Sequence, residues 1–188
     1  MKFCFQVFFV SATILTSLNL FAQKEKHLGL NATLETSSTN FRPSAGIIYE
    51  QRFTKRSGIE TGIYYRNYIQ NFVFIFNSPT GSSVANIRLS ERHLSIPALY
   101  KFYTRFVNIS AGPSFEFYLG WKQKSDNQTI KTVEYSNNSA FNIGLMAKIG
   151  RSIKLNERFN LEPEVRFNPI ITNDRAYIGL GLAAKYKL

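Results

Sequence analysis

The chain has 188 residues, a formal net charge of +11, 15% aromatic residues and a single cysteine, Cys4. One cysteine excludes a disulfide within the chain, and because Cys4 lies in an N-terminal segment that we expect to be cleaved, we expect no cysteine metal site in the mature chain. After the first 23 residues, no segment approaches the roughly 18 consecutive apolar residues of a membrane-spanning helix.

Residues 1–22 have the layout of a secretory signal peptide. Lys2 precedes a long apolar run, and Ala22 is the small residue expected at a cleavage site. A membrane anchor helix is the alternative, but several polar residues interrupt the apolar run. We expect a mature domain of residues 23–188. Because an exported protein seldom meets nucleic acid, we expect its positive charge to face anionic lipid head groups and expect no nucleic-acid partner.

The mature region contains eight segments in which apolar and polar residues alternate, and almost nothing typical of a helix. They lie around residues 27–36, 44–54, 58–75, 93–103, 107–120, 141–153, 159–169 and 176–188. Each is close to, or longer than, the roughly 9–11 residues with which a tilted strand crosses a bilayer. The pattern predicts an all-β protein.

The two faces of these strands differ in a way that is unusual for a soluble protein. In HLSIPALYKFY (93–103), Leu94 and Ile96 point one way, whereas His93 and Lys101 point the other. Across the segments, the polar face is rich in glycine and carries charges of both signs. These are Glu35, Glu50, Arg52, Glu60, Arg66, Lys101, Glu116, Lys148, Glu162, Glu164 and Arg166. Because side chains fill an eight-stranded barrel, we expect these charges to form an interior plug, with the apolar face toward lipid.

The connections alternate in length. The segments TKRSG (54–58), TRF (104–106) and KLNER (154–158) are short; those at 37–44, 76–87, 122–138 and 169–174 are longer. This alternation is typical of transmembrane barrels with tight periplasmic turns and extended outer loops. The sequence finishes on a strand with Tyr186 and Leu188 on the apolar face, which also suits such a barrel.

Aromatic residues gather near both ends of the predicted strands, as expected for rings at membrane interfaces. Phe41, Phe72, Phe74, Phe117, Trp121, Phe141 and Phe167 lie toward the long loops, and Phe53, Phe102, Phe106, Phe159 and Tyr186 toward the short turns. Pro97, Pro113 and Pro163 fall inside predicted strands, where proline cannot donate to the ladder. We expect bulges there, or positions near an interface.

These observations predict an eight-stranded antiparallel transmembrane up-and-down β-barrel. A secreted, lipocalin-like soluble barrel that binds an apolar ligand is the alternative, because it also alternates apolar and polar residues. The two architectures differ in which strand face contacts apolar molecules: the outer face contacts lipid in a transmembrane barrel, and the inner face contacts the ligand in a lipocalin-like barrel.

The stretches RHLSIPALYKFY and VNISAGPSFEFYLG resemble the PorT-like outer-membrane β-barrel domain family. Leu94, Ile96, Pro97, Lys101 and Phe102 follow its characteristic strand, and Ser95 stands where an acid is usual. The later FNIGLMAKIG, FNLEPEVRFNPI and YIGLGLAAKYKL fit its closing strands. The resemblance covers essentially the whole mature chain; it implies an outer-membrane barrel without defined catalytic residues.

Catalysis is weakly supported by the sequence. Some small outer-membrane barrels act on lipid acyl chains with a His and a Ser, and His27, His93 and Ser95 are the available residues. All three lie on the predicted interior face, and no carboxylate partner for an imidazole is identifiable. We expect no catalytic or cofactor site.

A metal site is no better supported, because Asp126, Glu134 and Asp174 are isolated loop acids. The polar 122–139 loop, with Lys122, Lys124 and Lys131, is a candidate contact for outer-leaflet glycolipid or another envelope protein. The sequence therefore predicts an outer-membrane protein in contact with membrane lipids, with a structural or binding role through its outer loops and no catalysis.

Overall fold

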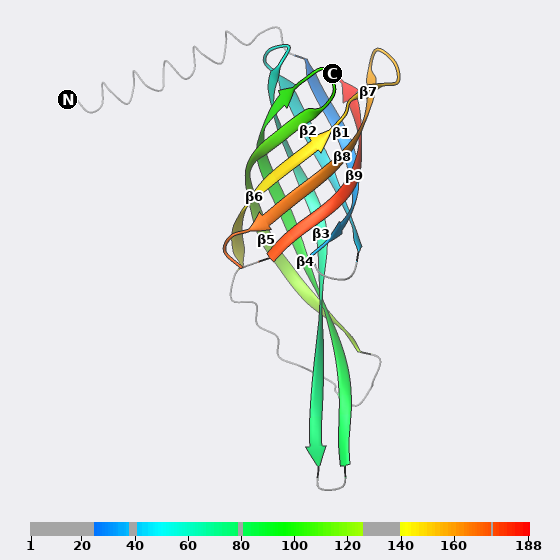
Figure 1. The fold of residues 1–188 in the computed structure, drawn as a ribbon, viewed down its shortest axis with the longest axis vertical. Coiled ribbons are helices and arrows are strands. Elements are labelled where there is room, and N and C mark those ends of the chain that lie inside the picture. Colours follow the sequence, from blue (N-terminus) through cyan, green and yellow to red (C-terminus); the bar gives the residue numbers. More distant parts are fainter. Residues whose placement is uncertain (1–24, 38–40, 79–80, 126–139, 174) are drawn as a thin grey trace, which may run out of the picture.

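The computed structural model describes residues 25–37, 41–78, 81–125, 140–173 and 175–188. They form a closed barrel of antiparallel strands (Figure 1). Within these ranges no helix is long and apolar enough to cross a membrane.

Eight long strands build the wall of the barrel, and a ninth has only two residues. They are β1 (Lys26–Thr36), β2 (Arg42–Arg52), β3 (Ser57–Ser78), β4 (Gly81–Tyr103), β5 (Asn108–Ser125), β6 (Phe141–Gly150), β7 (Ile153–Lys154), β8 (Phe159–Ile170) and β9 (Arg175–Lys187). Each long strand pairs with the next, and pairing of β9 with β1 closes the barrel. The short β7 pairs with β8 only. The predicted eight-stranded up-and-down barrel is confirmed.

Three tight turns lie at one end of the barrel, together with the start of β1 and the end of β9 (Figure 1). We call it the short-turn end. In each turn one polar side chain satisfies the backbone: Thr54 accepts from the amides of Arg56 and Ser57. Thr104 and Asn156 do the same in the two later turns. These side-chain bonds define compact turn conformations.

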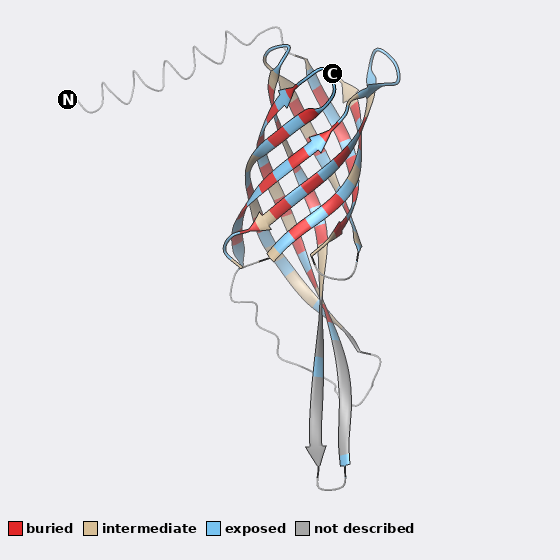
Figure 2. Ribbon diagram, in the orientation of Figure 1, coloured by how far each residue is buried: buried red, intermediate tan, exposed pale blue. Residues whose placement is uncertain are grey.

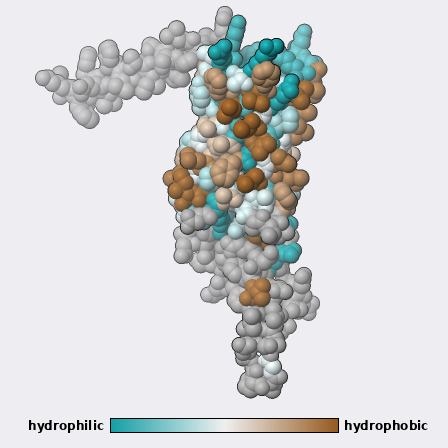
Figure 3. Space-filling model, in the orientation of Figure 1, coloured by the Kyte–Doolittle hydropathy of each residue, from teal (hydrophilic) through white to brown (hydrophobic). Residues whose placement is uncertain are grey.

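Burial alternates along the strands (Figure 2). The buried positions include most of the charged strand residues, and the exposed positions are mainly apolar. Glu50 and Arg166 are 3% and 0% exposed, whereas Val165 and Leu180 are 50% and 64% exposed. Figure 3 shows apolar side chains on the barrel wall and hydrophilic ones gathered at the short-turn end. A soluble lipocalin-like barrel would bury its apolar face, so this inverted polarity disfavours that alternative.

The hairpin of β3 and β4 is longer than predicted and projects beyond the barrel (Figure 1). Pairing of β3 with β2 reaches only Tyr65, whereas its pairing with β4 continues to Ser78. The expectation of a loop at 76–87 was wrong for 76–78 and 81–87, which pair within the hairpin; residues 79–80 lie outside the described residues. Phe72 and Phe74 lie on this hairpin, not at the barrel rim.

The loop expected at 122–139 is also shorter than predicted. Strand β5 continues to Ser125, and β4 pairs with it as far as Ile87. The first four residues of the expected loop are therefore strand. The remainder, 126–139, lies outside the described residues.

The bulges expected as one possibility at the prolines are absent, and their placement near a membrane interface stays a prediction. Pro97, Pro113 and Pro163 lie opposite Ser114, Leu145 and Leu182, in ladders whose register does not shift at those positions. The Thr61 hydroxyl donates to the Pro97 carbonyl at 2.7 Å.

The register shift between β4 and β5 falls instead between Arg92 and His93. Gly120 lies opposite Arg92 with a φ of +129°, a backbone conformation that side chains with a Cβ rarely adopt. The shift is a β-bulge that depends on this glycine. Beyond it, Arg92 and Lys122 both face outward.

Candidate functional site

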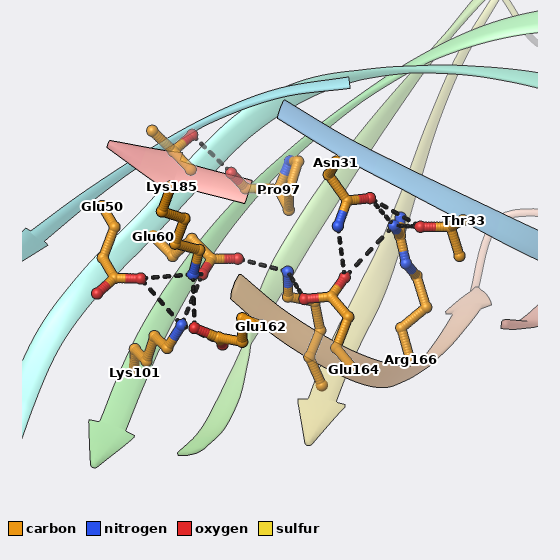
Figure 4. A network of polar contacts seen from close by, with 12 residues as sticks. Asn31, Thr33, Glu50, Glu60, Pro97, Lys101, Glu162, Glu164, Arg166 and Lys185 are labelled. Atoms are coloured by element: carbon orange, nitrogen blue, oxygen red, sulfur yellow. Dashed lines mark hydrogen bonds and ion pairs between the residues drawn. The ribbon is translucent and has the colours of Figure 1, made fainter. Parts of the chain in front are cut away.

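The lumen near the short-turn end is filled by three carboxylates around two lysines (Figure 4). The Lys101 ammonium lies 2.9, 3.0 and 2.5 Å from carboxylate oxygens of Glu50, Glu60 and Glu162. Lys185 contacts the same three groups at 2.6, 3.0 and 2.9 Å. Each ammonium thus has three carboxylate acceptors, which uses all of its N–H donors. This cluster ties together strands β2, β3, β4, β8 and β9.

The network continues along the barrel axis through shared carboxylates. Glu60 also contacts Lys148 at 2.5 Å, and Lys148 contacts Glu164 at 2.8 Å. Glu164 in turn lies 3.4 Å from Arg166, which also bonds Asn31 and Thr33 (Figure 4). Ion pairs therefore run without a break from β3 through β6 to β8.

Arg66 extends the network toward the β3–β4 hairpin. It lies 3.0 Å from Glu35 and 2.9 Å from Glu116, and it also bonds Asn168. Glu35 is shared with Arg166, 3.1 Å away. With these residues, all eight long strands contribute to one buried polar network.

The network has a structural consequence. Glu60, Arg66, Lys101 and Arg166 are each 1% exposed or less, so charged side chains fill this part of the lumen. A buried ion pair adds little net stability, but removing one partner leaves an uncompensated charge at high cost. The network therefore links all eight long strands, and breaking one of its pairs is expected to destabilise the barrel.

The plug is not wholly polar. Ile48, Tyr64, Leu99, Met146 and Ile170 face inward and are each 2% exposed or less. Tyr64 lies under the Arg166 guanidinium, 4.8 Å from its carbon, so aromatic faces separate some of the charges. The sequence analysis did not single out these inward apolar residues, because only charge and glycine distinguished the two faces there.

The structure brings His93 together with a carboxylate that the sequence analysis missed. Glu91 lies 3.0 Å from His93 and 2.6 Å from Arg175. The spacing Glu91, His93, Ser95 is the signal that could have revealed it, because alternate strand residues share a face. His93 Nδ1 and the Ser95 hydroxyl have no hydrogen-bond partner within the described part of the chain.

This arrangement does not form a nucleophile–base pair. A serine nucleophile needs a hydrogen bond to its base, and no such bond joins Ser95 to His93 among the described contacts. Both side chains are 0% exposed, so a substrate has no route to the hydroxyl. Glu91 with Arg175 and His93 is best understood as the last ion-paired layer of the plug.

The other sequence candidates are not brought together into a site. His27 is 3% exposed at the short-turn end, with its Nδ1 4.0 Å from Glu50. Among the described residues no three His, Cys, Asp or Glu side chains could share a metal ion. Asp126, Glu134 and Asp174 lie outside the described residues.

At the opposite end, exposed cations begin where the apolar wall stops. Phe117 and Leu119 on β5 are 39% and 51% exposed. The outward residues that follow are Lys122 on β5, and Arg92 and Arg88 on β4, all exposed. Phosphate groups occupy this boundary in a membrane, next to the hydrocarbon. We call these three residues the outer cation cluster.

Comparison with known proteins agrees with this geometry. Residues 11–173 match the family described as outer membrane protein beta-barrel domain. The chain belongs to this family. It is accordingly an outer-membrane β-barrel protein; in barrels of this kind, short turns face the periplasm and longer loops face the cell exterior.

Solved structures give the same fold at low sequence identity. A major outer membrane protein from Thermus thermophilus is 11% identical, with a TM-score of 0.55, covering 88% of this chain and 100% of that one. The outer membrane protein OprG from Pseudomonas aeruginosa is 12% identical, with a TM-score of 0.51, covering 88% and 96%. No curated protein matches the chain.

Proposed function

We propose that this chain is a non-enzymatic interaction protein of the outer membrane, in the PorT-like group that its Ile96-Pro97 strand resembles. On this proposal residues 1–22 are a cleaved signal peptide and residues 23–188 the mature domain. The plugged lumen supports a role in binding over one in conduction. The binding surface is the extracellular end.

The outer cation cluster supports outer-leaflet glycolipid as one ligand. The register places Ser90 opposite Lys122, and Arg88 and Arg92 lie two residues to either side of Ser90. Neighbours at this spacing on one face lie within about 7–8 Å, a distance that one phosphate group can bridge between two side chains. Arginine and lysine both bind phosphate through charge-assisted hydrogen bonds. The single observation that carries the proposal is this cation cluster directly above the apolar wall.

The test compares lipid binding by variants that remove positive charge from either end of the barrel. The protein is placed in nanodiscs with and without lipid A, and bound lipid is counted by native mass spectrometry. The triple variant R88Q/R92Q/K122Q is expected to retain at least tenfold less bound lipid A. K26Q, which removes an exposed cation from the periplasmic end, is the control. Equal retention of lipid A by the triple variant would refute the role of the cluster.

The β3–β4 hairpin supports a protein partner as a second ligand. Beyond Tyr65, the described pairing of β3 is with β4 alone, and from Gly81 to Asn86 that of β4 is with β3 alone. A two-stranded ribbon presents backbone donors and acceptors at both edges, which suits addition of a partner strand. Crosslinking from Val73, which is 64% exposed, tests this on intact cells. A β1 position such as Leu30 on the lipid-facing wall is the control.

A further inference from the structure

The periplasmic mouth of the barrel contains a pocket of about 320 Å³. Its floor includes His27 and Tyr103, which belong to the interior face of the strands. Its walls include residues of the turns that follow β4 and β6 and of the end of β9. The volume is at the small end of the range for ligand sites, roughly 300–1,000 Å³.

The pocket walls carry a large excess of positive charge. Six cations line it: Arg52, Lys55, Arg105, Arg151, Lys154 and Lys187. Two acids, Glu25 and Glu157, line it as well. Seven carboxylates are buried in the lumen and at its outer end, where buried cations nearly balance their charge. Few acidic side chains therefore remain to balance the cations at the mouth. The mouth is therefore strongly basic.

The acids do not neutralise the turn cations. Glu25 is shared by Arg52 at 3.3 Å and Lys187 at 2.6 Å. Within the described part of the chain, Arg105, Arg151 and Lys154 form no ion pair. All three are exposed. Since like charges repel in so small a volume, this arrangement favours a bound anion.

A buried polar atom in the pocket also lacks a partner. His27 is 3% exposed and lines the pocket, and its Nδ1 has no hydrogen-bond partner among the described residues. The nearest carboxylate, Glu50, is 4.0 Å away. The Arg52 Nε atom is likewise buried without a partner there. Unsatisfied buried polar groups of this kind point to an additional bonding group.

We propose that the periplasmic mouth binds a phosphate-bearing anion. Three arginines around one pocket match the fork geometry with which guanidinium binds phosphate oxygens, and the charge excess suits a ligand with two or more negative charges. The phosphate can belong to a soluble periplasmic molecule or to a phospholipid head group reaching over the rim. The site lies at the other end of the barrel from the outer cation cluster, so each proposal can fail without the other.

The test uses inorganic pyrophosphate as the probe and the protein in zwitterionic phosphatidylcholine nanodiscs. Isothermal titration calorimetry measures affinity, and ¹⁵N NMR follows the His27 ring. Pyrophosphate is expected to bind and to shift the His27 Nδ1 signal. The triple variant R105Q/R151Q/K154Q is expected to bind pyrophosphate at least tenfold more weakly. The three substituted side chains are exposed and mostly outside strands. R88Q/R92Q/K122Q removes equal charge at the far end and is expected to bind normally.

Further arms distinguish the sources of the phosphate. If phosphatidylglycerol in the nanodisc prevents pyrophosphate from binding, the site binds a lipid head group. If pyrophosphate binds equally with and without phosphatidylglycerol, the site binds a soluble phosphate. Either result supports the proposal. It is overturned by the absence of binding, by equal weakening in both triple variants, or by citrate binding as tightly as pyrophosphate.

Discussion

Glu60 is the residue at which the buried network is most vulnerable, because three lysines share its carboxylate. Lys148 lies 2.5 Å from one oxygen, and Lys101 and Lys185 each lie 3.0 Å from the other. Glu60→Gln keeps the shape but removes the charge and turns an N–H₂ donor toward ammonium groups. Removing one partner of a buried ion pair costs about 3–5 kcal/mol, and we expect a loss of unfolding free energy in that range.

The unfolding free energy can be measured by urea titration of the protein refolded into phosphatidylcholine vesicles. The chain has one tryptophan, Trp121 on β5, so its fluorescence reports on barrel unfolding without competing signals. The mobility of unheated protein on a denaturing gel checks that each variant folds before titration.

Two comparisons make the measurement specific. Combining Glu60→Gln with Lys185→Met removes one charge of each sign and is expected to recover about 0.5–3 kcal/mol relative to the sum of the single variants. Glu25→Gln, at a pair whose side chains are 40% and 44% exposed, is expected to cost less than about 1 kcal/mol. A loss below about 1 kcal/mol for Glu60→Gln, with strict additivity in the double variant, would refute the reasoning.

Three further predictions follow from the geometry. Gly120→Val forces a branched side chain into a positive φ and is expected to cost about 1–3 kcal/mol in the same urea titration; an unchanged midpoint would contradict the bulge. Replacing residues 72–87 by Asn-Gly joins Asn71 to Arg88, already opposite each other, so heat-modifiable gel mobility should persist while co-purification of a protein partner disappears; loss of the folded band would show that the hairpin supports the barrel. The hydrogen bond from Lys187 holds the pKa of Glu25 below its usual 4.5, so this pair stabilises the fold above about pH 4.5 and ceases to do so as pH falls through the lowered pKa. Lys187→Met should raise that pKa in an NMR titration of the carboxyl carbon, and an unmoved midpoint would contradict the assignment.

The alternation of apolar and polar residues correctly predicted the barrel and the two faces of its strands, although the chain has low sequence identity to the solved structures. The inward positions of Glu50, Lys101 and Arg166 and the outward position of Leu180 followed from a period of two. This two-residue period is a local property of strand geometry, so it can be recognised in each segment without knowing which strands lie beside it. Glycine and charge on one face then indicated the barrel interior.

The errors arose where pairing overrides local composition. The segment 76–87 was expected to be a long loop, yet its residues pair across the hairpin as far as Ser78 and Gly81. The bulge occurred at Gly120 and not at Pro97, because a register shift reflects how two strands meet. Neither feature can be read from one strand in isolation.

What the sequence determined by itself is therefore the number of long strands and which side of each one meets lipid, since both depend on neighbouring residues. Only the tertiary structure decided which charges meet. Lys185 and Glu50 are 135 residues apart, and they come within 2.6 Å because β9 pairs with β1 and β1 with β2. Barrel closure and strand stagger fix that distance, and both are properties of the whole sheet.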